Sequence, residues 1–413
     1  MKKRLYLMLC LTLVVGMLVG CAAGTEQIGQ NNSSQNPSFA KDKISQKVVE
    51  GNTNFALDIF KQLDKEDLEQ NIFISPLSIS TALTMTYQGA AESTKEAMSN
   101  ALGYNGIEDG ILNDSYKNLI PYLNQLDEKV ILDINNSIWV REGEDIKPEF
   151  LAVNEDVFQA PVTQMNFSQE NAAEKINKWI EEATNKKIDK MVDSPIDSDV
   201  IMYLINAIYF KGDWAEQFES ENTFETSFLS EDGRSQKVMM MSRTGEVEYG
   251  QGDKYQAVRL PYGSGKIAMY CVLPEKGVMV SDFIAGLNTE KWQEIKDSIA
   301  EQGEVILQLP RFKLEYGIKN LNDSLTALGM GEAFTGQADF SGIRDEILIS
   351  QVLHKAVIEV NEEGSEAAAA TEVEMKLTAV QNPLAFIADR PFVFVIADDD
   401  TGTILFMGSY KKG

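Results

Sequence analysis

The chain has 413 residues, of which 44% are hydrophobic and 24% are charged, and this composition is that of a globular protein with a large core. It carries 37 Lys and Arg against 63 Asp and Glu, a formal net charge of −26, which argues against nucleic acids as partners. Its three cysteines and one histidine are too few for a zinc site built from several such ligands. Because Cys10 and Cys21 lie in an N-terminal leader, Cys271 has no intrachain disulfide partner. We expect no metal and no cofactor.

Residues 1–20 have the pattern of a signal peptide. Three basic residues precede the apolar run 5–20, whose sixteen residues would span roughly 24 Å as a helix, less than a bilayer core. The run ends in Leu18-Val19-Gly20-Cys21, which resembles a bacterial lipobox and implies cleavage before Cys21 and acylation of its sulfur. Lipid chains make such an attachment durable. We expect an extracytoplasmic protein anchored by lipid to the bacterial cell membrane through Cys21.

Residues 21–45 are rich in Gln, Asn, Ser and Gly, a composition that cannot bury a core, and we expect a flexible tether there. No repeat and no second linker follows. Residues 46–413 are therefore expected to form a single domain.

Hydrophobic periodicity predicts helices in the first part of this domain and strands in the second. Apolar residues at helical spacing indicate a helix over 55–63, a second helix opened by a capping box at Ser93 and Glu96, and a third over 176–183. The predicted strands are 202–210, 258–260, 267–273, 305–309, 352–360, 392–397 and 404–407. Helices first and strands later indicate the α+β class.

Three features of the domain suggest catalysis, and each fits a structural role better. His354, the only imidazole, lies in an apolar strand pattern, and no G-x-S-x-G nucleophile turn is present. Asp400-Thr401-Gly402 matches one half of an aspartic-protease dyad, but it occurs once, at a hairpin turn. Gly263-Ser264-Gly265-Lys266 is too short for a phosphate-binding loop and connects two strands. We assign no catalytic residue and do not expect an enzyme.

The segment 362–376 carries the most information. A small or apolar set of residues alternates with a mostly charged set, which is the pattern of a half-buried strand, whereas a helix would carry charge on every face. The alternative is an exposed alanine-rich helix or linker. The smallest side chains lie next to Gly364 and suit a chain that must slide between two strands already close together. The small set is Ser365, Ala367, Ala369, Thr371, Val373 and Met375.

This segment resembles the hinge of the reactive-centre loop of inhibitory serpins, and matches in the family's order extend over nearly all of residues 46–411. They are Asn71 to Ile79, Leu204 to Trp214, Leu309 to Phe312, Ala338 to Gly342, Arg390 to Phe392, and Leu405 to Gly408. The resemblance implies the serpin fold, with three β-sheets, about nine helices and an exposed reactive-centre loop.

The resemblance also implies suicide trapping of a protease. The protease's nucleophile attacks the loop and forms an acyl-enzyme, and the severed loop inserts into the main sheet with the protease attached. Distortion of the oxyanion hole then stalls deacylation. The implied partner is a serine protease, or a cysteine protease, with elastase-like or subtilisin-like enzymes favoured. We expect a monomer that contacts the membrane only through its N-terminal lipid.

The resemblance assigns roles to named positions. The hinge comprises Glu362, Glu363, Gly364, Ser365, Glu366, Ala367, Ala368, Ala369, Ala370 and Thr371. A polar cluster beneath the opening sheet, the shutter, comprises Ser75, Ser78, Asn206 and His354. The breach, where insertion begins, holds Trp214 and Arg311, and Arg311 is expected to pair with Glu362.

Counting sixteen residues from Glu362 places the reactive bond between Thr378 and Ala379. The stretch from there to Arg390 is longer than is common in the family, which leaves the register of the cut open. A protease specific for basic residues would instead cleave after Lys376, and the shorter insertable segment would favour release.

Two other functions were weighed against inhibition. A non-inhibitory serpin tends to carry bulky, charged or proline residues in the hinge, whereas this hinge carries Ser365 and four alanines. A solute-binding lipoprotein would share the lipobox, the tether and the acidic domain, but it requires a two-lobed α/β pattern.

Overall fold

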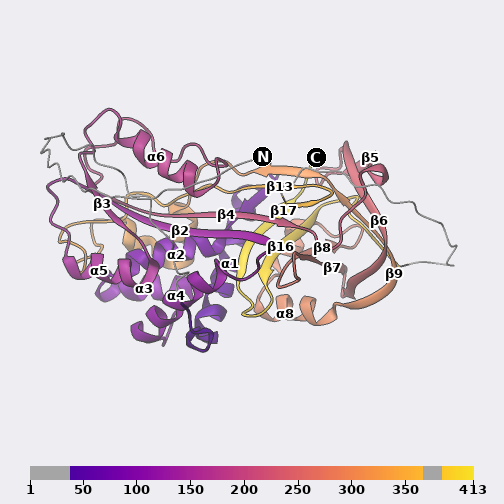
Figure 1. The fold of residues 1–413 in the computed structure, drawn as a ribbon, viewed down its shortest axis with the longest axis horizontal. Helices are drawn as coiled ribbons and strands as arrows, with labels where there is room; N and C mark the ends of the chain where they lie inside the picture. Colours follow the sequence, from indigo (N-terminus) through magenta and orange to yellow (C-terminus); the bar gives the residue numbers. More distant parts are fainter. Residues whose placement is uncertain (1–37, 366–383) are drawn as a thin grey trace, which may run out of the picture. The chain divides into compact units, whose positions relative to one another are not determined.

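The structure is a computed structural model that describes residues 38–365 and 384–413 (Figure 1). Several predictions fall outside these residues: the signal peptide 1–20, the tether as far as residue 37, the lipidation site Cys21, the hinge residues Glu366, Ala367, Ala368, Ala369, Ala370 and Thr371, and the cleavage positions Lys376, Thr378 and Ala379.

Nine α-helices occur in the described part of the chain. They are α1 (Gln46–Glu66), α2 (Pro76–Tyr87), α3 (Glu92–Leu102), α4 (Asp109–Leu123), α5 (Pro148–Phe158), α6 (Ala172–Ala183), α7 (Val280–Ala285), α8 (Thr289–Ser298) and α9 (Asn322–Leu325).

The strands of the described residues form three sheets. The main sheet has six strands in the order β10 (Phe312–Glu315), β13 (Val357–Val360), β14 (Gly364–Ser365), β4 (Met202–Asp213), β2 (Val130–Arg141) and β3 (Val162–Met165). A nine-stranded sheet runs β1 (Ile72–Ile74), β17 (Ile404–Tyr410), β16 (Phe392–Asp398), β8 (Ile267–Pro274), β7 (Tyr255–Tyr262), β6 (Ser235–Gly252), β9 (Ala300–Pro310) and β15 (Leu384–Ile387), with β5 (Phe224–Leu229) also paired to β6. The third sheet pairs β11 (Lys319–Asn320) with β12 (Leu353–His354).

The main sheet is covered on both faces, because its strands are apolar on both. Figure 1 shows α2 under β2 and β4 and α6 on their opposite face. Successive residues of β4 point to opposite faces: Leu204 packs on the large core and Ile205 on a second core formed with α6. In α6, Ile176 and Ile180 are fully buried against that second core. Both faces of β4, the strand beside β14, are therefore packed against apolar side chains.

The predicted fold class, the three sheets and the nine helices are confirmed. Two local predictions are wrong. Ser93 does not cap a helix, since α3 begins at Glu92 and the Ser93 hydroxyl donates to the carboxylate of Glu332. The strand predicted over 352–360 is broken between His354 and Val357, so that it belongs to two sheets.

The predicted border between tether and domain lies several residues too late. Residues 41–43 form a short 3-10 helix, and the backbone N–H of Ala40 donates to the side chain of Asn118 on α4 at 2.7 Å. The ring of Phe39 packs edge-on against Tyr122 at 5.4 Å between centroids. These contacts attach Phe39 and Ala40 to the domain, although the polar composition of residues 21–45 predicted a tether there. No helix within residues 38–365 or 384–413 is long and apolar enough to cross a membrane.

Candidate functional site

The chain reverses direction directly after β13. The Asn361 N–H donates to the carbonyl of Gly364 at 2.9 Å, and the Asn361 side-chain oxygen accepts from the N–H groups of Glu363 and Gly364. After this turn, Gly364 and Ser365 run between β13 and β4 as β14. The first two small residues of the predicted hinge therefore already lie inside the main sheet.

Gly364 allows an unusually close approach of two backbones. It faces Asp213 of β4, and a Cβ atom at position 364 would lie 2.2 Å from the carbonyl oxygen of Gly212. Real Cβ atoms do not approach backbone so closely, so any side chain here would push β14 away from β4. The seat of β14 thus depends on glycine at 364.

Ser365 is 2% exposed, and its hydroxyl lies 2.8 Å from the Tyr262 hydroxyl. The Tyr262 ring stacks on Trp214, with centroids 4.4 Å apart and planes 15° apart. Burial raises the pKa of Tyr262 well above its ordinary value, so its phenol remains protonated and able to donate. A small hydroxyl at 365 fits this buried site, and a large or charged side chain does not.

Trp214 and Glu362 fix the turn above β14. The Trp214 backbone N–H donates to the Glu363 carbonyl at 2.7 Å, and its indole N–H donates to the Asn361 carbonyl at 2.9 Å. The Glu362 carboxylate accepts from the Thr223 hydroxyl at 2.7 Å, and it lies 3.6 Å from Arg311, the ion pair that the sequence resemblance implies. The predicted breach positions are thus brought together around the turn.

Below Ser365 the main sheet is open. In the described part of the chain, β14 pairs with only the last two residues of β4, Gly212 and Asp213. Residues 202–211 of β4 therefore have no neighbouring strand on the side that faces β13. A cavity of about 310 Å³ lies along the opening, between residues 201–208 and residues 347–355. Backbone groups along one edge of β4 are therefore available to a further strand.

Three of the four predicted shutter residues, Ser78, Asn206 and His354, line this cavity, and Ser75 is hydrogen-bonded to Ser78 and His354. The ring Nε2 of His354 accepts from the backbone N–H of Ser75 at 3.1 Å. The Ser75 hydroxyl accepts from the Ser78 N–H and donates to the carbonyl of Leu405, while the Ser78 hydroxyl donates to the Asn206 carbonyl at 3.5 Å. Hydrogen bonds thus connect α2, β4, β12 and β17 at this point.

His354 is held neutral. Burial lowers its pKa to about 4, because a charged imidazolium would lose its hydration in this apolar surrounding. Its Nε2 acts as an acceptor, which requires the neutral ring. These observations describe a structural histidine rather than a general base.

Sequence reasoning missed a polar connection across the opening. Lys355 has a side chain only 9% exposed, and its ammonium lies 3.0 Å from Glu315 of β10 and 3.4 Å from Asp189. Asp189 belongs to the segment between α6 and β4, whereas Lys355 lies between β12 and β13. The only available signal was a lysine within an apolar run at 352–358.

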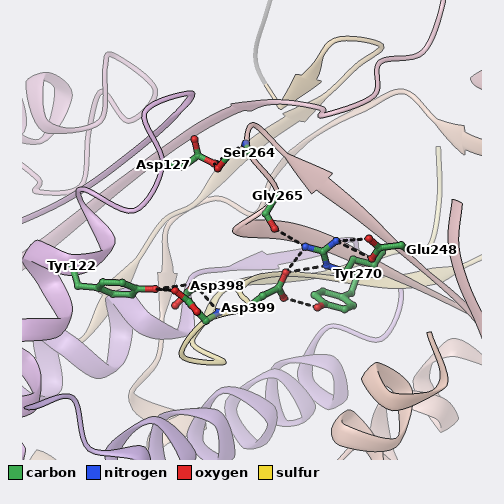
Figure 2. A network of polar contacts seen from close by, with 10 residues as sticks. Tyr122, Asp127, Glu248, Ser264, Gly265, Tyr270, Asp398 and Asp399 are labelled. Atoms are coloured by element: carbon green, nitrogen blue, oxygen red, sulfur yellow. Dashed lines mark hydrogen bonds and ion pairs between the residues drawn. The ribbon is translucent and has the colours of Figure 1, made fainter. Parts of the chain in front are cut away.

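The two motifs that resembled catalytic sequences have structural roles (Figure 2). The Asp398 carboxylate accepts from the N–H groups of Asp400 and Thr401, which closes the β16–β17 hairpin turn. In the connection between β7 and β8, Ser264 donates to Asp127 and the Gly265 carbonyl accepts from Arg259. Arg259 also pairs with Glu248 and Asp399 in Figure 2, and its charge is thereby compensated.

Within the described residues, no group of His, Cys, Asp and Glu side chains could hold a metal ion. Cys271 is a free, fully buried thiol whose pKa burial raises, so it is unsuited to act as a nucleophile. The arrangement can accept a β-strand through backbone pairing.

Comparison with known proteins agrees with this geometry. A family model described as "Serpin (serine protease inhibitor)" matches residues 50–412. The chain is 36% identical to human (Homo sapiens) neuroserpin over 86% of this chain and 89% of the relative. It is 35% identical to the leukocyte elastase inhibitor of Bos taurus over 86% of this chain and 97% of that protein. The native crystal structure of tengpin, a thermophilic serpin, superposes with a TM-score of 0.81 and 31% identity, covering 91% and 96% of the two chains.

Proposed function

The chain belongs to the serpin family, and on that premise we propose that it inhibits serine-type proteases outside the cytoplasm by suicide trapping. Its reactive-centre loop, which begins with the hinge at Glu362 and contains the proposed reactive bond between Thr378 and Ala379, is the bait. Cleavage frees the N-terminal part of the loop from Leu384, and that part enters the main sheet behind Ser365 with the protease attached through its acyl bond. The membership in this family removes the alternative of a two-lobed solute-binding lipoprotein.

One observation carries the proposal: β14 begins a strand that the sheet does not complete. Gly364 and Ser365 pair with β4, and ten further residues of β4, 202–211, have no strand on that side in the described structure. The residues that follow in sequence, 366–371, are Glu, four alanines and Thr. Small side chains continue the alternation of Ser365, so the loop can extend β14 without a steric clash. A non-inhibitory serpin has no need of this match between hinge and opening.

We further propose an elastase-like or subtilisin-like target and cleavage between Thr378 and Ala379. Thr378 suits a small or open primary pocket, and a relative that is 35% identical is named leukocyte elastase inhibitor. Cleavage after Lys376 by a trypsin-like enzyme is the alternative. We also propose lipid anchoring through Cys21, which would place the bait at the outer surface of the cell membrane.

The test is incubation of the mature protein with elastase-like, subtilisin-like and trypsin-like proteases, followed by denaturing gels and mass spectrometry. A trapped protease gives a complex that survives denaturation, because the acyl bond is covalent. The mass of the released C-terminal fragment gives the cut site. Loop cleavage by every protease without a stable complex would contradict the proposal. For the anchor, metabolic labelling with a fatty acid should mark the wild-type chain and not Cys21→Ser.

A further inference from the structure

Residues 39–45, which we call the strap, lie along one face of α4. The Ser45 N–H donates to the Ser115 hydroxyl at 3.0 Å. Near the other end of the strap, the Ala40 N–H donates to the side chain of Asn118 at 2.7 Å. Positions 111, 115, 118 and 122 are three or four residues apart, so they form one stripe on the helix. The strap therefore fixes the place at which the chain enters the domain.

Two large apolar side chains are exposed on this face. Phe39 of the strap packs edge-on against Tyr122 and is 38% exposed. Ile111, at the other end of the α4 stripe, is 45% exposed. An isolated exposed apolar residue is ordinary, but here two of them lie on the same helix face as the strap. We call this surface, made of residues 39–45 and the stripe of α4, the strap face.

Lysines of the strap neutralise acidic side chains on the strap face. Lys41 lies 2.7 Å from Asp400 of the β16–β17 turn, and Lys43 lies 3.7 Å from Asp114 of α4. The whole chain carries a formal charge of −26, so an average face of the domain is repelled by anionic lipid headgroups. A face whose carboxylates are paired with lysines meets less of this repulsion. The strap face is therefore better suited than an average face to lie near a lipid surface.

The strap face is also the part of the domain nearest in sequence to the proposed lipid attachment. Seventeen residues, 21–37, separate Cys21 from the first described residue, Ser38. A chain of this length spans at most about 60 Å. Confinement by so short a connection corresponds to a local concentration of the order of millimolar, at which even a weak surface contact becomes populated.

We propose that the strap face is the side of the anchored domain that contacts the lipid surface, with Phe39 and Ile111 entering the headgroup region. The inference rests on the proposed anchor at Cys21. Figure 1 shows α4 and α6 on opposite sides of β2 and β4, so this orientation directs the α6 side of the main sheet away from the membrane. The main sheet is then free to open, and a trapped protease to be carried along it, without meeting the lipid surface.

The first experiment measures which side of the anchored protein faces the lipid. Glu108→Cys, directly before α4, and Glu174→Cys, on α6, each place a fluorescent donor at an exposed position, while Cys271 is fully buried and unreactive. The lipidated chain is reconstituted in vesicles of phosphatidylcholine and phosphatidylglycerol that contain an acceptor-labelled lipid. We expect energy transfer to be several-fold greater from position 108 than from position 174. Equal transfer from the two positions, or greater transfer from position 174, would overturn the inference.

The second experiment repeats the transfer measurement in two matched variants. Phe39→Ser/Ile111→Ser removes the exposed apolar side chains of the strap face, and Leu229→Ser/Met239→Ser removes two exposed apolar side chains on β5 and β6. We expect the difference between the two label positions to disappear in the first variant and to persist in the second. The same result in both variants would contradict an orientation set by the strap face. Dimers of the free protein that Phe39→Ser/Ile111→Ser abolishes, seen by analytical ultracentrifugation, would assign the face to a second copy instead.

The anchor, the orientation and the inhibition are tested separately. A chain that fails to sediment with vesicles would refute acylation at Cys21. In that case a polyhistidine tag at position 21, held by a nickel-chelating lipid, keeps the same connection length and allows the transfer measurement to be repeated. A failure to trap any protease would refute the proposed inhibition and leave the orientation measurable.

Discussion

The hydroxyl of Ser365 and the hydroxyl of Tyr262 lie 2.8 Å apart in the protein interior, 103 residues apart in sequence. Ser365 is the last described residue before the loop, and Tyr262 ends β7 of the nine-stranded sheet. The hinge is therefore bonded to a strand outside the main sheet. In the proposed mechanism, insertion proceeds from this contact.

Replacement of Ser365 by Arg should convert the inhibitor into a substrate. Position 365 is buried beside Tyr262, and a guanidinium there would be desolvated without an acid to pair with. We expect the arginine to displace β14 from the main sheet while the rest of the domain folds and the loop is still cleaved, with the covalent complex reduced by at least about tenfold on denaturing gels. Ser365→Ala is the matched control, since it keeps the small size and loses only the hydrogen bond, and it should still trap. Undiminished trapping by Ser365→Arg would contradict insertion through this position.

The pH dependence of stability should contain a contribution from His354. Burial lowers its pKa from an ordinary 6.5 to about 4. Between pH 4 and 6.5, His354 is therefore protonated in the unfolded chain and neutral in the folded protein. The contribution is complete above pH 6.5 and is lost as the pH falls toward 4, with a slope of at most about 1.4 kcal/mol per pH unit.

The measurement is urea unfolding of the wild type and His354→Gln at intervals between pH 4 and 7.5. Carboxylates titrate in both proteins, so the difference between the two curves isolates the imidazole. Glutamine retains an oxygen that can accept from the Ser75 N–H. We expect the difference to shrink as the pH falls through the window. A difference independent of pH would show that His354 is not held neutral in the folded state.

The hinge could be identified from sequence, but its contacts could not. The alternation of small and charged residues after Gly364 is local, and Ser365 lies in a strand as predicted. Tyr262 belongs to the nine-stranded sheet and Trp214 directly follows β4, and no local pattern indicates which aromatic residue meets a given hydroxyl. Positions 75, 78, 206 and 354 were grouped through a family resemblance, because their hydrogen bonds connect four separate elements.

The errors have the same physical origin. Ser93 and Glu96 have the spacing of a capping box, but Ser93 donates to Glu332, which is 239 residues away. The run 352–360 is mostly apolar, yet β12 ends at His354 and the next residue, Lys355, pairs with Glu315 and Asp189. Long-range polar contacts outweighed local preference in both cases.

The ion pair between Lys355 and Asp189 should slow the opening of the main sheet. Asp189 precedes β4 and Lys355 precedes β13, and the proposed insertion would separate these two strands. Asp189→Asn removes this cross-opening contact and leaves Lys355 paired with Glu315. We expect loop insertion after cleavage, followed by stopped-flow fluorescence, to become a few-fold faster at low salt. Asp193→Asn, in the same segment, is the control. Unchanged insertion in Asp189→Asn at low salt would remove this contact from the mechanism.

Cleavage within the loop should raise the thermal stability of the protein. Among the described residues of the intact chain, no strand pairs with residues 202–211 of β4 on the side of the opening. Insertion of roughly ten residues at about 1 kcal/mol net per hydrogen bond would release on the order of 10 kcal/mol. This gain is comparable with the whole stability of an ordinary domain, about 5–15 kcal/mol, so the native state must be protected by a kinetic barrier.

The test is to nick the loop with a protease that is not trapped, remove that protease, and compare melting by differential scanning calorimetry. We expect the nicked wild type to melt well above the intact wild type. Nicked Ser365→Arg should melt close to intact Ser365→Arg, because the arginine prevents the loop from extending β14. If intact and nicked wild type melt at the same temperature, the main sheet has no unfilled strand position and the trapping mechanism fails with it.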